Sequence, residues 1–305
     1  PEDRLFNGQL SEQRWFDLRY KSQHHLSVLA NSSVRGLIGP RISMIPHQLS
    51  IAHDVSERRL PRVLLSDEVG LGKTIEAGLI LHRLLMLGRV SRVLILVPDS
   101  LMHQWLVEML RRFNLHFSLF NDNRYEAIRE TAGDYNPFYT EQLVLCSQSL
   151  FFHHPEATSE VLDAGWDLLV VDEAHHLEWS PENASEEYTQ VATLAAVVPS
   201  VLLLTATPEQ LGRASHFARL RLLDPDRFHD YDVFLEEAES YNGVADAIDA
   251  LMGEKELDIL HLPKLRKLLT SKDEAALLER IISSSDEQQS LALRHALVAQ
   301  LLDRH

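Results

Sequence analysis

The sequence has 305 residues, enough for one large domain or two ordinary ones with a substantial buried core. Its single cysteine, Cys146, excludes an internal disulfide framework and a zinc site built from several cysteines. No signal-peptide pattern opens the chain, and no run approaches the roughly 20 apolar residues of a membrane span. We therefore expect a reducing, cytoplasmic location, and Pro1 in place of Met indicates an excised fragment.

The formal net charge of −16, taken as a whole, disfavours a basic nucleic-acid-binding module, because phosphate contacts require an excess of Lys and Arg. The charge is segregated, however. It is +4 over residues 1–121, −13 over 122–187, −1 over 188–233 and −6 over 234–305. We interpret the acidic block as a solvated face, with contact to a protein partner left open.

Residues 1–41 have a mixed composition, and Gly36, Gly39 and Pro40 predict a lead-in or linker segment. Beyond them, short apolar runs alternate with segments long enough for helices, such as 74–87 and 101–113. The predicted strands are residues 63–65, 93–97, 143–146, 168–171 and 201–204. Strands that are apolar on both faces and separated by helices are typical of a mostly parallel sheet covered on both sides.

We therefore expect an α/β domain over residues 42–230. In residues 231–305 the strand-like runs vanish and apolar residues recur at helical spacing, which predicts an extension of several short helices. Cys146 is interpreted as a buried small apolar residue, and Trp15 and Trp105 as packing anchors rather than base-stacking platforms.

A phosphate-binding turn is predicted within residues 62–75, where an apolar strand leads into a Gly-containing turn and then a helix. Such a turn directs backbone N–H groups at an anion, and the helix N-terminus adds its dipole. In such a turn Lys73 can reach the β- and γ-phosphates, and the Thr74 hydroxyl can hold Mg²⁺. The expected nucleotide-binding residues of this turn are Asp67, Glu68, Val69, Gly70, Leu71, Gly72, Lys73 and Thr74.

Two acids follow the predicted strand 168–171, at the strand end where ligands bind in parallel sheets. Asp172 would hold the Mg²⁺ ion, and Glu173 would orient and deprotonate the attacking water. Together with Lys73 they are the predicted catalytic residues. Thr205 and Thr207 follow the strand 201–204, where their hydroxyls would relay hydrogen bonds between the nucleotide site and a neighbouring surface.

Over roughly residues 46–208 these motifs resemble the Swi2/Snf2 branch of the superfamily 2 helicase-like ATPases. DEVGLGKT resembles the branch's phosphate-binding motif, with Asp67 in place of the usual Gly, and DEAH and LTATP resemble two later motifs. The resemblance implies a RecA-like P-loop fold with ATP and Mg²⁺ as cofactors. It also implies a role for the following residues: Gln48 in adenine reading, His175, Thr205 and Thr207 in coupling, and Pro98, Ser100 and Ser147 in nucleic-acid contact.

Several runs, among them HQWLVEMLRRFN, are similar to bacterial RNA polymerase-associated ATPases of this branch. That similarity implies a hydrolase that translocates on double-stranded DNA, binds the RNA polymerase core and promotes its recycling, as a nucleoid-associated activator of transcription. Nothing after residue 208 resembles the motifs of a second RecA-like lobe. Because that lobe supplies arginine fingers worth roughly 10³–10⁵ in rate, we expect this first lobe alone to hydrolyse ATP poorly.

Two other functions stay open. One is a lobe of a strand-separating helicase or a restriction-enzyme motor of the same superfamily, which strand-displacement assays on the full-length protein would distinguish. The other is an interaction platform for RNA polymerase that nucleotide only tunes. In that case Glu173→Gln would abolish turnover and leave polymerase binding intact.

Overall fold

The computed structural model describes residues 12–66, 72–133, 135–206, 212–252, 271–283 and 287–304. Two compact units make up the chain, Pro1–Arg227 and Phe228–His305. The described strands all lie in the first unit. The sequence places its division a few residues further along, between residues 230 and 231.

The predicted strands are all present, and the helices predicted at 74–87 and 101–113 begin and end within one residue of α4 and α5. The first unit contains α2 (Gln13–Ala30), α3 (Pro46–Glu57), β1 (Arg62–Leu65), α4 (Lys73–Met86), β2 (Val93–Val97), α5 (Met102–Phe113), β3 (Ser118–Phe120), α6 (Asp122–Ala132), β4 (Leu143–Ser147), α7 (Leu150–His153), α8 (Glu156–Asp163), β5 (Leu168–Val171), α9 (Glu186–Val197), β6 (Ser200–Leu204) and α10 (Gly212–Leu223). Strand β3 escaped prediction because it has only three residues, at the sheet edge.

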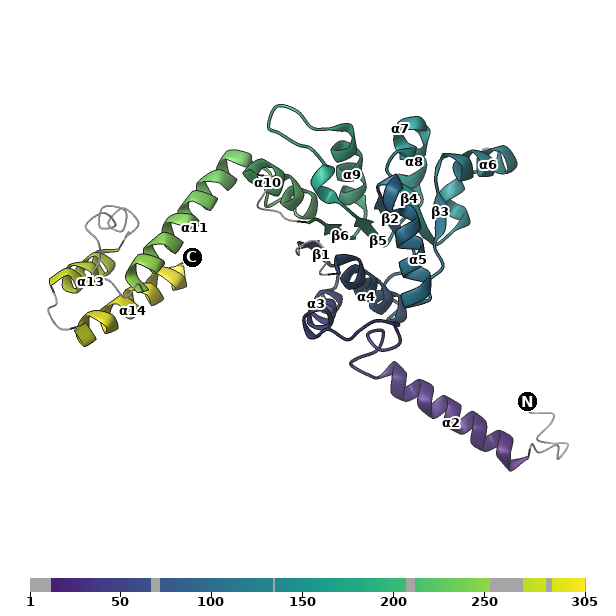
Figure 1. Ribbon diagram of the computed structural model, residues 1–305, viewed down its shortest axis with the longest axis horizontal. Coiled ribbons are helices and arrows are strands. Elements are labelled where there is room, and N and C mark those ends of the chain that lie inside the picture. The colour runs from purple at the N-terminus through teal and green to yellow at the C-terminus, as the bar shows by residue number, and fades with distance from the viewer. Residues whose placement is uncertain are drawn as a thin grey trace. The chain divides into compact units, whose positions relative to one another are not determined.

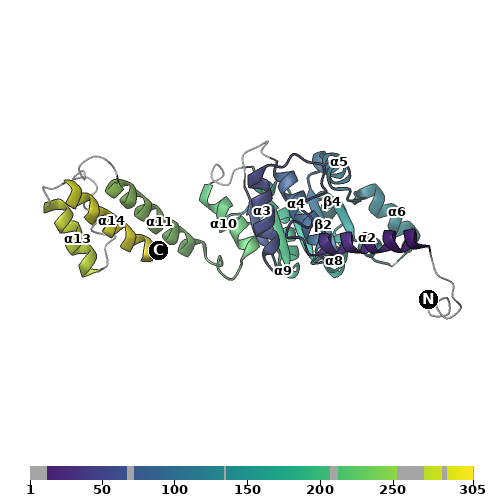
Figure 2. The ribbon, with the colours of Figure 1, turned by 90° about the horizontal axis from the view of Figure 1, so that it is seen from below.

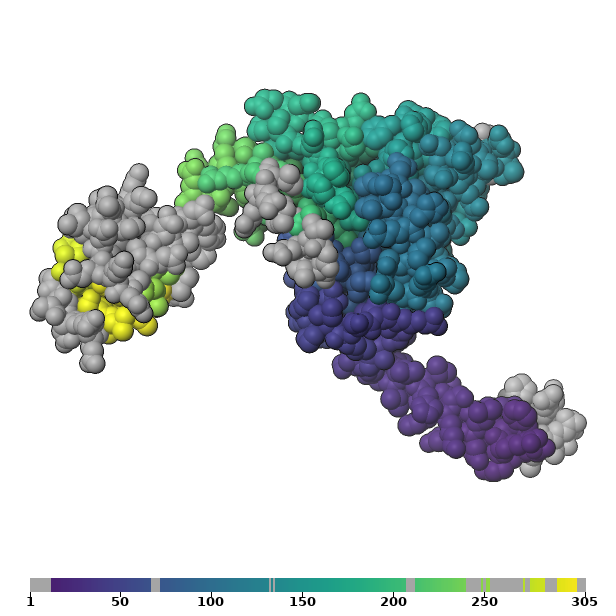
Figure 3. Space-filling model, in the orientation of Figure 1, coloured from purple at the N-terminus to yellow at the C-terminus, as the bar shows by residue number. Residues whose placement is uncertain are grey.

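The strands form one parallel sheet in the order β1-β6-β5-β2-β4-β3. Alternate side chains point to opposite faces, so each central strand contributes to two apolar clusters. Helices α3, α4 and α5 cover one face and α8, α9 and α10 the other (Figures 1 and 2). In the space-filling view the packed side chains of this part of the chain run in colour from blue to green (Figure 3). The expected α/β fold, covered on both faces, is confirmed.

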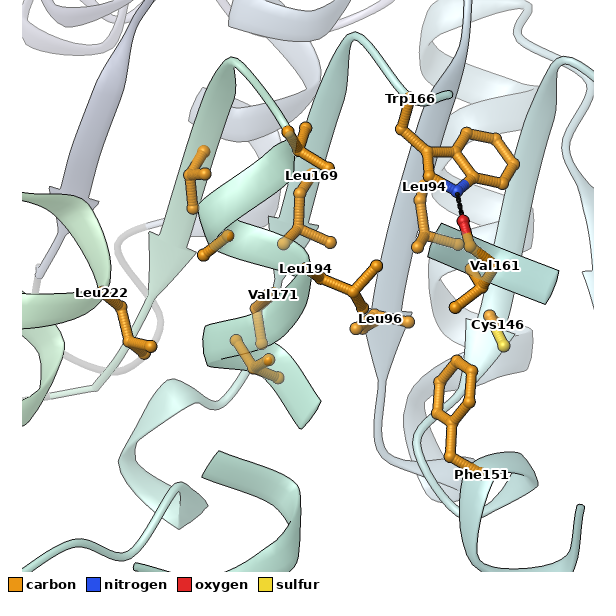
Figure 4. Packing of buried hydrophobic residues seen from close by; sticks show 14 of the residues in the cluster. Leu94, Leu96, Cys146, Phe151, Val161, Trp166, Leu169, Val171, Leu194 and Leu222 are labelled. Carbon is orange, nitrogen blue, oxygen red and sulfur yellow. Dashed lines mark hydrogen bonds between the residues drawn. The ribbon is translucent and has the colours of Figure 1, made fainter. Parts of the chain in front are cut away.

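The cluster against α8, α9 and α10 shows how the alternation works (Figure 4). Leu94 and Leu96 of β2 point into it beside Leu169 and Val171 of β5, while the intervening residues face α4 and α5. Cys146 lies in the same cluster, fully buried, as the sequence predicted. Burial on both faces is why these strands read as continuous apolar runs.

The segment predicted as a linker contains structure of its own. All residues of α2 are exposed, so the prediction that Trp15 is a packing anchor is wrong within the described residues. Further on, Arg83 of α4 donates a hydrogen bond to the carbonyl of Ser33 at 2.8 Å. Gly36 (φ +82°) lies so close to α4 that an added Cβ would be 2.6 Å from the Arg83 Cα atom.

The second unit contains α11 (Tyr231–Met252), α13 (Lys272–Ser283) and α14 (Glu287–Arg304). Its core includes Leu251, Leu278 and Leu297. The helical extension is confirmed, but the expectation of short helices is wrong, because α11 has 22 residues and α14 has 18. Among the described residues, no helix is both long and apolar enough to cross a membrane.

Candidate active site

The parallel topology brings the predicted motifs to one edge of the sheet, because the carboxyl ends of β1, β6 and β5 lie side by side. The backbone N–H of Thr205, just after β6, donates to the carbonyl of Leu65 on β1 at 3.0 Å. The N–H of Asp172, just after β5, donates to the carbonyl of Leu96 on β2 at 2.9 Å. Because β6 and β5 are adjacent in the sheet, Thr205 and Asp172 lie at the ends of neighbouring strands.

Helix α4 begins at this edge directly after Gly72, whose backbone is left-handed (φ +94°, ψ 36°). The Gly72 carbonyl accepts the first helical hydrogen bonds, from Ile75 at 2.8 Å and Glu76 at 3.0 Å. The first N–H groups of a helix have no partner within the helix, and the dipole makes that end attractive to anions. Lys73 and Thr74, half-buried in the first turn, are placed where phosphate oxygens would bind.

Gln48 lies against the same turn. It is buried on α3, and a Cβ built on Gly72 would come within 2.6 Å of the Gln48 amide nitrogen. Gln48 and Gly72 are therefore in van der Waals contact, although 23 intervening residues separate them in the sequence. The predicted nucleotide residues Asp67, Glu68, Val69, Gly70 and Leu71, and the predicted coupling residue Thr207, lie outside the described residues.

Asp172 is 7% exposed, and both of its carboxylate oxygens accept hydrogen bonds. Oδ1 accepts from the backbone N–H of Glu173 at 2.8 Å, and Oδ2 from the indole Nε1 of Trp105 at 2.6 Å. Burial raises the pKa of the Asp172 carboxyl, while these hydrogen bonds and the Lys73 ammonium act in the opposite direction. The structure thus brings Lys73 and Asp172 into one electrostatic environment.

Glu173 adopts a left-handed backbone conformation (φ +49°, ψ 42°), which is uncommon for a residue with a side chain. Its Oε2 lies 2.9 Å from Nδ1 of His175. Burial, and then the neighbouring His176, lower the pKa of His175, so the imidazole is neutral at pH 7.

The Thr205 side chain is completely buried, and its hydroxyl has no hydrogen-bond partner within the described part of the chain. Buried hydroxyls are normally paired, so an unpaired one at this edge is where a bound group would be recognised. The oxygen groups of Asp172, Thr74 and Thr205 are the ligand type that Mg²⁺ prefers. Among the described residues, no group of three or more His, Cys, Asp or Glu is placed to hold a metal ion.

The predicted nucleic-acid residues follow β2 and β4. Pro98 directly precedes a short 3₁₀ turn, and Ser100 lies within that turn and is exposed. Ser147 is 1% exposed, and its hydroxyl donates to the carboxylate of Asp99 and contacts the Ser149 hydroxyl at 2.7 Å. The Ser147 hydroxyl is thus bonded within the protein, to the turn that follows β2, and its role as a nucleic-acid contact stays a prediction.

The sequence does not predict the hydrogen bond between Trp105 and Asp172. The sequence predicts a packing role for Trp105, and this side chain does lie on the buried stripe of α5 with Met102, Met109 and Phe113. Its hydrogen bond depends on β2 and β5 being neighbours in the sheet, and β4 and β3 separate these strands in the chain. No local pattern signals that contact.

A family model described as the SNF2-related domain matches residues 48–292. The RNA polymerase-associated protein RapA of Pectobacterium carotovorum subsp. carotovorum (strain PC1) is 55% identical over all 305 residues, and the chain spans 31% of its length.

Two solved structures are similar, a Sulfolobus solfataricus SWI2/SNF2 ATPase core in complex with dsDNA and the same core domain. Each has a TM-score of 0.53 to this chain and 15% sequence identity, and each match covers 87% of this chain. The matched region is 59% of the DNA-bound core and 57% of the core solved alone. At that identity the likeness shows the fold alone. Because the family model covers most of the sequence, the chain belongs to the SNF2-related domain family, in the Swi2/Snf2 branch that its motifs resemble.

Proposed function

We propose that the chain is the first ATP-binding lobe of an ATP-driven translocase on double-stranded DNA. The observation that carries the proposal is the arrangement at the sheet edge. Lys73 begins a helix behind Gly72 and Gln48, and Asp172 and Glu173 follow the strand next to β6. This pairing of an anion-binding helix end with two strand-end acids is what nucleoside triphosphate hydrolysis requires.

Different residues of the chain bind the phosphates, contact the adenine and activate the attacking water. The N-terminal end of α4 binds the phosphates through its backbone N–H groups and its dipole, and the Lys73 ammonium neutralises their charge. Gln48, held against the turn, reads the adenine. Glu173, whose Oε2 lies 2.9 Å from Nδ1 of His175, orients the attacking water and takes its proton.

Thr74 and Asp172 would hold a Mg²⁺ ion, and the Thr205 hydroxyl would relay hydrogen bonds between the nucleotide site and a neighbouring surface. When bound, the ion neutralises charge on the β- and γ-phosphate oxygens. The buried position of Asp172 keeps this carboxylate away from bulk water and ready for that partner.

The proposed binding partners of the longer protein are inferred from the similar proteins. The 55% identity to a protein named as RNA polymerase-associated supports RNA polymerase as a partner of the longer protein, and with it a place in the bacterial cytoplasm, on the nucleoid. The similar core in complex with dsDNA supports double-stranded DNA as the track. A second RecA-like lobe would supply the arginine fingers, so the chain alone hydrolyses ATP slowly.

The test measures binding of a fluorescent ATP analogue with Mg²⁺, and ATP turnover with and without duplex DNA. Lys73→Ala should weaken nucleotide binding at least about tenfold, as loss of a charged phosphate contact predicts. Lys21→Ala, at an exposed position of α2, is the matched control and should bind as the unsubstituted chain does. Turnover should lie about 10³-fold or more below that of the full-length enzyme.

Failure of the unsubstituted chain to bind Mg²⁺ and ATP would contradict the proposal. DNA-stimulated turnover close to the full-length rate would contradict the part that assigns arginine fingers to another lobe.

A further inference from the structure

Trp105 donates its indole hydrogen bond to a carboxylate of the candidate site. Its side chain is 1% exposed, and its indole N–H donates to Oδ2 of Asp172 at 2.6 Å. Oδ1 of the same carboxylate accepts the backbone N–H of Glu173 at 2.8 Å. Two donors, one on each oxygen, fix the rotation of the carboxylate about its side-chain bond. The hydrogen bond from Trp105 is buried and its acceptor is a carboxylate, and such charge-assisted hydrogen bonds are stronger than those between neutral groups.

A second tryptophan shows what packing alone looks like. Trp166 is also buried, and its indole N–H donates to the backbone carbonyl of Val161 at 2.8 Å, in the cluster on the other face of the sheet (Figure 4). A buried indole N–H needs an acceptor, and a backbone carbonyl suffices. Trp105 instead uses the acid on which the proposed Mg²⁺ site depends.

The position of Trp105 in the fold adds a second reason. It is the fourth residue of α5, which follows the turn after β2 that carries Pro98 and Ser100. Strand β2 is hydrogen-bonded to β5, which ends at Asp172. A rigid indole therefore joins the first turn of α5 to the strand-end acid, one strand away in the sheet.

We propose that Trp105 is a positioning residue, whose indole N–H holds the Asp172 carboxylate in the orientation that binds Mg²⁺ with ATP. This role rests on the proposed function. It is absent from the motif-based list of site residues, and it acts through Asp172 rather than on the nucleotide. Partners that orient a metal ligand from outside the coordination sphere typically contribute 10- to 100-fold to metal affinity.

The test compares Trp105→Phe with Trp166→Phe. Both variants keep an aromatic ring in the core and remove one indole hydrogen bond, but only the first removes a bond to Asp172. Mg²⁺ is titrated at a fixed concentration of a fluorescent ATP analogue. Trp105→Phe should raise the Mg²⁺ concentration at half-maximal binding about 10- to 100-fold. Trp166→Phe should leave that midpoint unchanged, and binding in EDTA should be the same for both.

A background of Asp172→Asn provides a further check, because Trp105→Phe should there add no further shift in the midpoint. An unchanged midpoint in Trp105→Phe, or an equal shift in Trp166→Phe, would overturn the positioning role alone. Absence of any Mg²⁺-dependent nucleotide binding by the unsubstituted chain would overturn the proposed function together with it.

A measurement on the unsubstituted chain covers the case in which Trp105→Phe does not fold. The four tryptophans can be labelled with 5-fluorotryptophan and followed by ¹⁹F NMR, with signals assigned through Trp15→Phe, Trp166→Phe and Trp179→Phe. Mg²⁺ added to the ATP-bound chain should shift the Trp105 signal and leave the Trp166 signal in place. A Trp105 signal that does not respond to Mg²⁺ would overturn the proposal.

Discussion

At the scale of single residues, the site depends on two backbone conformations that most residues avoid. Gly72 and Glu173 both have left-handed backbones, one at the start of α4 and one just after β5. For Gly72 the conformation costs little, since glycine has no Cβ. For Glu173 such a conformation costs of order 1–3 kcal/mol, and residues of this kind cluster at active sites. The strained residue here is the proposed general base.

Gly72→Ala is expected to damage the nucleotide site more than it damages the fold. The added Cβ would meet the Gln48 amide at 2.6 Å and displace it from the turn, and alanine at positive φ costs about 1–2 kcal/mol in stability. We expect at least a tenfold loss in ATP affinity, measured with a fluorescent analogue. Gly88→Ala, at the other end of α4 with φ +67° and open space around it, is the control.

Gly88→Ala should lose a similar stability in urea unfolding and bind ATP normally. Equal ATP affinities for the two variants would show that contact with Gln48 does not matter.

At the scale of elements, Arg62 joins the ends of two helices. Its guanidinium donates to the carbonyls of Ala195 and Val198 at the end of α9, and of Leu222 and Leu223 at the end of α10. The last carbonyls of a helix lack partners within it, and a cation there also suits the helix dipole. From the first residue of β1, Arg62 thereby fixes α9 and α10 against the edge of the sheet.

Arg62→Met should lower the free energy of unfolding by about 2 kcal/mol, because methionine keeps the apolar stem and leaves four carbonyls without their donor. This value allows for water replacing part of the lost bonding at a half-buried site. Arg59→Met, at an exposed position just before β1, should change stability by less than about 0.5 kcal/mol. Urea unfolding followed by circular dichroism measures both, and equal losses would contradict the capping role.

At the scale of the whole molecule, the distribution of charge disfavours tight DNA binding by this chain alone. Residues 1–121 carry only +4, and residues 122–187 carry −13. In the turn after β2, Asp99 stands beside the exposed Ser100, so a carboxylate lies where a phosphate would approach. A groove shared with a second lobe would bring the missing positive charge.

We therefore expect the chain to bind duplex DNA with a Kd of about 10⁻⁴ M at 0.15 M salt, the weak end of non-specific binding. Few phosphates would be neutralised, so the slope of log K against log salt should be about −2 or smaller in magnitude. Fluorescence anisotropy across a salt series measures both quantities. A Kd below about 10⁻⁷ M at 0.15 M salt would show that this lobe alone forms a complete DNA-binding surface.

The sequence predicted most of the fold, because its signals are local. Apolar runs mark strands buried on both faces, and α4 and α5 follow from periodicity and from the residues that precede them. The same locality explains the errors. Three-residue β3 is too short to detect, and polar residues such as Glu236 and Glu237 in α11 face solvent without ending the helix.

By itself the sequence determined which residues stand at strand ends and helix starts, and so which chemistry the sheet edge offers. Lys73 and Asp172 were identified in this way. Only the tertiary structure decided which of these residues meet: Gln48 against Gly72, Trp105 on Asp172, and Ser147 on Asp99. The reason is physical, because these contacts depend on strand order and on which face each side chain takes, and both arise from packing between segments far apart in the chain.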